Sequence, residues 1–264
     1  MPARPLVTLL TDFGTADGYV GAMKGVLLST CPDVRIVDLS HEIPAGDVRA
    51  GAFALAAAAP LFPRATIHVA VVDPGVGTER RALLVESAGA FFIGPDNGLL
   101  SLAAPAPRTA WSLDRAEWFR QPVSATFHGR DVFAPVAAHL AGGVAPERLG
   151  TRVGEIHEIR VPIARREGDA RVGEVIHVDR FGNVVTSLHA RDLSDANAEA
   201  FVEIEGYNGR IPVLATYGKA PAGSVLAVVG SSGYVEIAVS SGSARGVLGG
   251  AAELGTAVRL VARR

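Results

Sequence analysis

Cysteine, excess charge and long apolar runs are all scarce in this sequence. The single Cys31 among 264 residues excludes an internal disulfide and a cluster of metal-binding thiolates. Lysine and arginine number 25 against 27 aspartates and glutamates, and no block of one sign stands out, so electrostatic capture of nucleic acid is not expected. Apolar stretches such as the alanine-rich 54–59 fall well short of a membrane span.

What is present indicates an ordinary globular protein. Hydrophobic residues make up 48% of the chain and charged residues 20%, which is enough apolar surface for a core and too much for disorder. The 30 glycines and 16 prolines exclude collagen-like and low-complexity chains. The apolar run near residue 10 is too short for a secretion signal. We therefore expect a cytoplasmic protein with no membrane partner, built as one large domain or two modest ones.

The first part of the chain alternates between strand and helix patterns. Residues 6–10 form a continuous apolar run, typical of a strand buried on both faces of a parallel sheet. Further strands are expected at 35–40, 66–73, 82–86 and 90–93, and helices at 19–31, from an Asp47 cap to about 59, and at 133–141. This order predicts an open α/β sheet domain over residues 1–160.

From about Ile159 the helical periodicity gives way to short strand patterns separated by Gly, Asn, Asp and Pro. Strands are expected at 172–178, 183–188, 200–204, 210–213, 224–229, 235–239 and 257–261. The charged stretch 165–169 is interpreted as a solvated turn near the boundary. The second part is therefore predicted to be a small all-β domain of barrel or sandwich type, over residues 168–264.

Two carboxylates follow predicted strands of the first domain. Asp12 comes after the first strand and Asp73 after the third, and ligands bind beyond the carboxyl ends of strands in open α/β sheets. Either aspartate alone could be a turn or cap residue, but two on Gly-containing loops of one sheet favour a site. Arg80 or Arg81 could fold back onto Asp73. The loop lacks the Lys-Ser/Thr ending of a phosphate-binding P-loop.

A polar loop precedes the helix predicted at 133–141. His128 lies there beside Gly129, which would allow close approach of a ligand. Asp131 could cap the helix, and Arg130 could pair with it.

Two polar corners interrupt the strands of the second domain. The corner at 179–184 could be a bulge or tight turn, or a ligand site in which Phe181 stacks and the amide of Asn183 pairs with an adenine edge. The corner at 230–236 is interpreted first as a turn, with contact to a small polar ligand as the alternative.

These segments together resemble the S-adenosyl-L-methionine (SAM) hydroxide adenosyltransferase family, which is related to SAM-dependent fluorinating and chlorinating enzymes. The matching segments are LTDFG (10–14), CPDV (31–34), VDPGVGT (72–78), GPDNG (94–98), FHGRDVFAP (127–135), DRFGN (179–183) and GSSG (230–233). The resemblance implies an N-terminal α/β domain, a C-terminal β-barrel and a homotrimer with SAM bound at subunit interfaces. It implies hydrolysis of SAM to adenosine and L-methionine, with no cofactor and no metal.

The resemblance also implies roles for single residues. The catalytic triad falls on Asp73, Arg80 and His128. The implied substrate-binding residues are Asp12 at the ribose, Phe127 near the reacting carbon, Phe181 and Asn183 at adenine, Asp179 and Ser231 toward methionine, and Glu236.

The implied reaction suits these groups. Methionine leaves the sulfonium as a neutral thioether, so the step needs an oriented water behind C5′ rather than a general acid. The triad would bias that water toward hydroxide, with His128 or Asp73 as the proton acceptor.

Three rival functions are weighed against hydrolysis. The first is a SAM-dependent halogenase. Halogenating relatives carry a Ser and a Tyr where this chain has Gly129 and His128, and the Asp73 carboxylate would repel a halide. The second is a non-catalytic adenosine or SAM sensor, which would not need the triad. The third, a methyltransferase, lacks its GxGxxG loop after the first strand.

Overall fold

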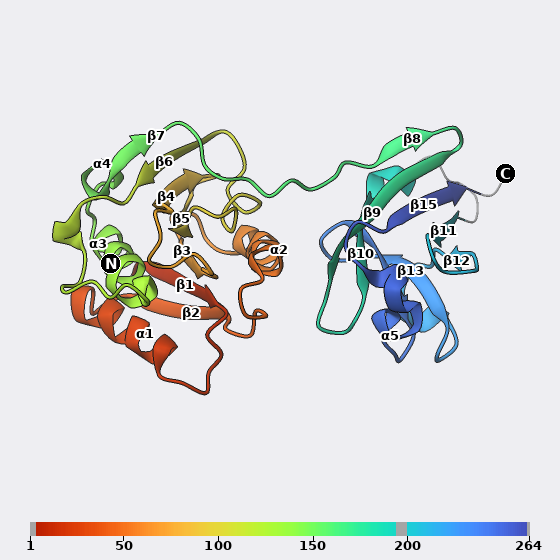
Figure 1. The fold of residues 1–264 in the computed structure, drawn as a ribbon, viewed down its shortest axis with the longest axis horizontal. Coiled ribbons are helices and arrows are strands. Elements are labelled where there is room, and N and C mark those ends of the chain that lie inside the picture. The colour runs from red at the N-terminus through yellow and green to blue at the C-terminus, as the bar shows by residue number, and fades with distance from the viewer. Residues whose placement is uncertain (1–3, 194–199, 263–264) are drawn as a thin grey trace. The chain divides into compact units, whose positions relative to one another are not determined.

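The computed structural model describes residues 4–193 and 200–262. The chain divides into two compact units, one running to Ile159 and the other beginning at Arg160 (Figure 1). Within the described residues, no helix is both long enough and apolar enough to cross a membrane.

The first unit is built on a seven-stranded mixed sheet. Its strands are β1 (Leu6–Thr11), β2 (Arg35–Ser40), β3 (Ile67–Val71), β4 (Ala82–Ser87), β5 (Ala90–Pro95), β6 (Arg108–Ser112) and β7 (Thr151–Val153), in the order β2-β1-β3-β5-β4-β6-β7. β1 pairs in parallel with β2 on one side and with β3 on the other. The chain connections therefore diverge between β1 and β3, which opens a crevice at the carboxyl ends of these strands.

Helices cover both faces of this sheet. They are α1 (Tyr19–Thr30), α2 (Val48–Ala58), α3 (Ala134–Ala141) and α4 (Pro146–Leu149), with the short turns η1 (Ala59–Leu61), η2 (Ala116–Trp118) and the π-helical η3 (Gly129–Phe133). Leu9 packs in one buried cluster with residues of α1 and α3, and the next residue, Leu10, packs in another with residues of α2. The prediction of a first strand buried on both faces is thus confirmed. The predicted cap is confirmed too, because Asp47 accepts a hydrogen bond from the Ala50 N–H at 2.8 Å.

The second unit is a barrel-like sheet. Its strands are β8 (Arg165–Glu167), β9 (Ala170–Val178), β10 (Val184–His189), β11 (Ala200–Ile204), β12 (Ile211–Pro212), β13 (Val225–Val229), β14 (Tyr234–Val239) and β15 (Ala257–Ala262). The order is β12-β11-β15-β9-β10-β14-β13, with β8 paired to β9. A bridge between Val213 and Ala227 links the two ends of this order, so the sheet nearly closes around its core. The short helical segments are η4 (Ala190–Leu193), η5 (Tyr217–Lys219), α5 (Ala244–Leu248) and η6 (Gly249–Ala252).

The predicted fold class is confirmed: an open α/β sheet precedes a small barrel. One local interpretation is wrong, because 165–169 is not simply a turn. Arg165–Glu167 pairs with β9 as β8, and only the tip at Gly168 turns, with φ of +59°. All three residues of β8 are exposed, as suits a charged edge strand. The strands β6 and β7 and the helix α5 were not anticipated, since each is short and depends on its neighbours.

Candidate active site

The candidate active site lies where β1 and β3 end. Asp12 follows β1 directly, and Asp73 follows β3 after one intervening residue. Both carboxylates line a cavity of about 380 Å³, together with Phe127 and His128 from the loop before α3. The structure therefore brings four of the predicted site residues of this unit around one space, at the crevice where α/β sheets bind ligands.

Arg80 joins Asp73 to His128. Its Nη2 lies 2.5 Å from Asp73 Oδ2 and 2.7 Å from His128 Nδ1, and its Nε lies 3.0 Å from Asp73 Oδ1. The side chains of Asp73 and Arg80 are only 4% and 11% exposed, so water screens this ion pair weakly. Arg81 does not take part, because its guanidinium pairs with Asp96 at 2.5 Å.

The contact with Arg80 assigns the tautomer of His128. A guanidinium only donates hydrogen bonds, so Nδ1 of His128 must be the acceptor and the ring proton sits on Nε2. Burial, and then the nearby charge of Arg80, hold the pKa of His128 below its usual value, despite the opposing charges of Asp73 and Asp131. His128 is therefore neutral at neutral pH and offers an N–H donor.

Close backbone packing holds the Asp73 loop against the His128 loop. Gly77 has φ of +77°, and a Cβ there would lie 2.4 Å from the carbonyl oxygen of Ala125. A Cβ on Gly129 would lie 3.2 Å from the sulfur of Met23 and 3.3 Å from the ring of Phe13. Gly77 is needed because a Cβ there would push the two loops apart, and Gly129 lets the His128 loop pack closely against α1 and Phe13.

Asp131 does not cap the following helix, contrary to one of the two sequence interpretations. It lies inside the η3 turn with a fully buried side chain, which accepts hydrogen bonds from Arg130, from Arg120 and from the N–H of Ser124. The expected pairing with Arg130 is confirmed. The buried carboxylate needs these donors, so the side chain turns inward rather than to the helix end.

The loop after β1 is held in place by several hydrogen bonds. The N–H of Gly46 donates to Asp12 Oδ2 at 2.8 Å. The N–H of Gly14 donates to the carbonyl of His41 at 2.8 Å, and the N–H of Phe13 donates to Thr11 Oγ1 at 3.3 Å. The carboxylate of Asp12 is thus fixed at the edge of the cavity while its other oxygen remains available.

A polar relay behind this loop was missed in the sequence. Thr11 Oγ1 lies 2.9 Å from His41 Nδ1, and His41 Nε2 lies 3.0 Å from Asp38 Oδ1 without hydrogen-bond alignment. Burial would raise the pKa of Asp38, but the hydrogen bond from Lys24 and the close approach of His41 outweigh it and hold that pKa below its usual value. The strand-end rule that selected Asp12 and Asp73 also applies to the end of β2, and would have drawn attention to His41, which follows that strand directly.

The predicted site residues of the second unit lie on its turns and strand ends. Asp179 accepts hydrogen bonds from the backbone N–H of Asn183 at 2.8 Å and from its side-chain Nδ2 at 2.9 Å. The ring of Phe181, between them, is 77% exposed. The amide oxygen of Asn183 is not used in these bonds, so it remains an acceptor.

Glu236 and Ser231 complete this set. Glu236 accepts a hydrogen bond from the hydroxyl of Tyr217 at 3.2 Å, a partner that sequence reasoning missed. Burial, with the charge of Asp179, raises the pKa of Glu236 despite that hydrogen bond. Ser231 is exposed on the turn between β13 and β14.

No group of three or more His, Cys, Asp or Glu side chains among residues 4–193 and 200–262 could hold a metal ion.

Comparisons with known proteins cover both units. Residues 7–150 match the model of the SAM hydroxide adenosyltransferase N-terminal domain, and residues 173–256 match that of its C-terminal domain. A protein from Thermus thermophilus named (R)-S-adenosyl-L-methionine hydrolase is 45% identical over 258 residues, which cover 93% of this chain and 96% of that protein. A fluorinase from Nocardia brasiliensis is 28% identical over 276 residues, which cover 91% of this chain and 92% of the fluorinase.

A solved structure shows the same architecture. The crystal structure of an uncharacterized conserved protein from Thermotoga maritima has a TM-score of 0.87 and 33% sequence identity, and covers 97% of this chain and 99% of that one. The paired domain matches and the strand-end cluster point the same way: this chain belongs to the SAM hydroxide adenosyltransferase family.

Proposed function

We propose that this protein hydrolyses SAM, as its (R)-sulfonium epimer, to adenosine and L-methionine. The observation that carries the proposal is the meeting of Asp12, Asp73 and His128 around one cavity, with Arg80 bridging the last two. The name of the 45% identical Thermus thermophilus relative supports the same activity and the same epimer.

In the proposed step, a water bound between Asp73 and His128 attacks C5′ of SAM. The C5′–sulfur bond breaks, its electron pair stays on sulfur, and methionine leaves as a neutral thioether. His128 donates its Nε2–H to the water oxygen, because Nδ1 is occupied by Arg80. Asp73 Oδ1 accepts one hydrogen bond from Arg80 whereas Oδ2 accepts two, so Oδ1 retains a lone pair for the water proton.

The charge of Arg80 decides which group accepts the proton in this step. A proton on His128 Nδ1 would place two cations within hydrogen-bond distance, so His128 is a poor proton acceptor beside Arg80. We therefore assign proton acceptance to Asp73. The positive charge of Arg80 also stabilises the hydroxide that develops, in a site with little water to screen it.

The remaining predicted residues bind the substrate. Asp12 accepts hydrogen bonds from the vicinal ribose hydroxyls, and Phe127 lines the cavity near C5′. Phe181 offers an exposed ring for stacking on adenine, and the amide oxygen of Asn183 accepts from its amino group. We assign the methionine end to Asp179, Ser231 and Glu236.

The family resemblance carries three further parts of the proposal: a homotrimer with active sites at subunit interfaces, a cytoplasmic location and metal-independent catalysis. Mass measurement in solution tests the first, because a monomer would contradict it. Activity that survives dialysis against EDTA supports the last, and loss of activity restored by a metal would contradict it.

Hydrolysis is tested by mixing the protein with each sulfonium epimer of SAM in H₂¹⁸O. We expect adenosine and methionine in equal amounts from the (R) epimer, with ¹⁸O in the 5′ hydroxyl of adenosine. Parallel reactions with added chloride or fluoride should give no 5′-haloadenosine. A halogenated product would identify a halogenase, and tight SAM binding with no methionine released would identify a sensor.

A further inference from the structure

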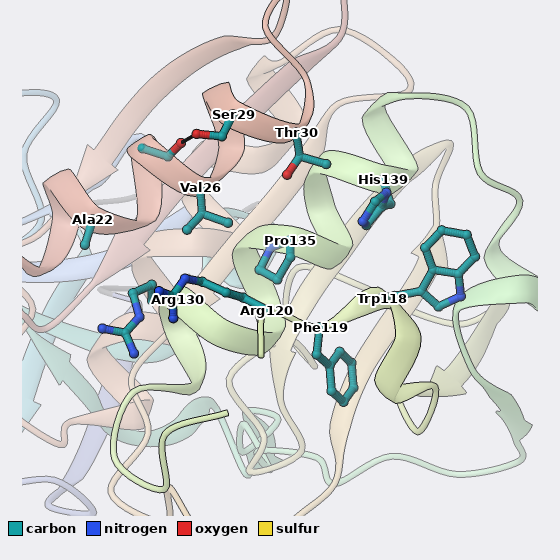
Figure 2. Close-up of a pocket in the computed structure, with 11 residues that line it drawn as sticks. Ala22, Val26, Ser29, Thr30, Trp118, Phe119, Arg120, Arg130, Pro135 and His139 are labelled. Carbon is teal, nitrogen blue, oxygen red and sulfur yellow. Dashed lines mark hydrogen bonds between the residues drawn. The ribbon is translucent and has the colours of Figure 1, made fainter. Parts of the chain in front are cut away.

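A second cavity of about 500 Å³ lies between α1, α3 and the segment around η2 (Figure 2). It shares no lining residue with the candidate active site. Figure 2 shows Arg120 and Arg130 toward one end of the cavity and Trp118 and His139 toward the other, with Pro135 between them. The cavity therefore has a cationic end and a largely apolar end.

The cationic end has more positive than negative charge. Arg120 and Arg130 both bind Asp131, whose side chain is fully buried, so one carboxylate faces two guanidinium groups. None of the residues that line the cavity is an Asp or Glu. The side chain of Arg120 is 47% exposed and contacts Asp131 through Nη1, at 3.2 Å. The remaining N–H groups of the Arg120 guanidinium can therefore bind a second anion.

The other end is lined mainly by aromatic and aliphatic side chains. Trp118 donates its Nε1–H to the carbonyl of Arg148 at 2.8 Å, so the polar edge of the indole is already paired. Phe119, Val26 and Pro135 add apolar surface. Burial lowers the pKa of His139, so its ring adds no charge at neutral pH. Ser29 and Thr30 add two hydroxyls, and that of Ser29 already donates to the Gly25 carbonyl at 2.7 Å, so a flat apolar body would displace water here with little loss of hydrogen bonding.

We propose that this cavity binds a small organic monoanion, a carboxylate attached to a flat apolar body. The carboxylate binds Arg120 and Arg130, and the body lies along Pro135 toward Trp118. A single negative charge neutralises the one positive charge that Asp131 leaves over. A carboxylate also matches the planar guanidinium fork. The site adjoins the proposed hydrolase site, since Arg130 lies 4.9 Å from the ring of Phe127, but the two cavities share no lining residue and the proposal does not depend on that activity.

Tryptophan fluorescence tests the proposal directly. The chain has two tryptophans; Trp118 lines the cavity, and Trp111 is buried in β6. Titration with benzoate should change the emission saturably, whereas benzamide, which has the same shape without the charge, should not. Arg120→Gln should weaken benzoate binding about tenfold or more, because a charge-assisted contact is lost. Asp131 keeps Arg130 and the Ser124 N–H in this variant, so folding should survive.

Matched variants show whether benzoate occupies this cavity. Arg148→Gln changes a guanidinium 5.6 Å from the Trp118 ring that does not line the cavity, and should leave benzoate binding unchanged. Asp73→Asn should also leave it unchanged. Equal binding of benzoate and benzamide, an Arg120→Gln protein that binds like wild type, or displacement of benzoate by adenosine would each overturn the proposal. Inorganic phosphate binding more tightly than benzoate would overturn the assignment to a carboxylate.

Discussion

The two units present their candidate site residues in different ways. In the first unit, Asp73 and Arg80 are almost fully buried and tied to His128 by short contacts. In the second unit, Asp179 and Asn183 are bonded to each other, but Phe181 projects from the turn between them and Ser231 is exposed. Buried, mutually bonded groups hold one geometry, which a chemical step requires, whereas exposed rings on turns offer surface for binding.

This contrast predicts a division of labour. Changes in the first unit should lower kcat, because they remove interactions made in the transition state. Changes in the second unit should raise KM, because they remove contacts made equally in substrate and transition state. Variants in each unit can therefore separate the two roles.

Asp73→Asn or His128→Ala should have the largest effect. Each removes one member of the bonded cluster, so we expect kcat for adenosine release to fall about a hundredfold or more with KM little changed. Asp96→Asn is the matched control, since it also alters a carboxylate paired with an arginine but lies outside the cavity. Near-wild-type turnover of either cluster variant, measured by product chromatography, would reject the proposed triad.

Phe181→Ala should act mainly on binding. Loss of an aromatic platform for a base costs about 1–3 kcal/mol, so we expect KM to rise roughly tenfold or more while kcat stays within about twofold. Phe181→Tyr should restore the KM, and Arg180→Ala, on the neighbouring exposed position, should leave it unchanged. A fall in kcat at constant KM would contradict the assignment of binding to the second unit and chemistry to the first.

Thr11→Val should have an intermediate effect through the Asp12 loop. It removes the hydroxyl that contacts His41 and accepts from the Phe13 N–H, at nearly constant volume. We expect kcat/KM to fall about fivefold to tenfold, since a buried group loses its partner. Thr11→Ser keeps the hydroxyl and should stay close to wild type. A Val variant that keeps the wild-type kcat/KM would show that the Thr11 hydroxyl does not position Asp12.

The last effect concerns stability in acid and leaves activity at neutral pH unchanged. Burial lowers the pKa of His68, on β3, to about 4, so the folded first unit favours the neutral ring. The contribution of His68 to the free energy of unfolding is fully present above the pKa of the unfolded chain, near 6.5. It is lost as the pH falls toward 4, which lowers the free energy of unfolding by on the order of 1–3 kcal/mol. Both tryptophans lie in the first unit, so their fluorescence in denaturant reports its unfolding. His68→Gln should flatten this part of the pH profile; an unchanged slope would assign it to other groups.

Much of the fold could be predicted because its signals are local. The apolar run of β1, the Asp47 cap and the spacing of Val20, Met23 and Leu27 on α1 all report burial along a few consecutive residues. The strands missed, such as β8, carry no such pattern. Arg165–Glu167 forms a strand only because β9 supplies its hydrogen-bonding partner.

The same limit applies to the candidate site. The sequence alone determined that Asp12 and Asp73 would stand at the carboxyl edge of a parallel sheet, because strand direction follows from the alternation of strands and helices. The residue pattern left Arg80 and Arg81 open and only the family resemblance chose Arg80 and His128; the tertiary structure decided the contacts, in which Arg80 bonds to Asp73 and meets His128, 48 residues further along. The buried position of Asp131 and the contact between His41 and Thr11 were likewise seen only in the tertiary structure. These contacts depend on how separate loops pack against one another, and no local pattern encodes that.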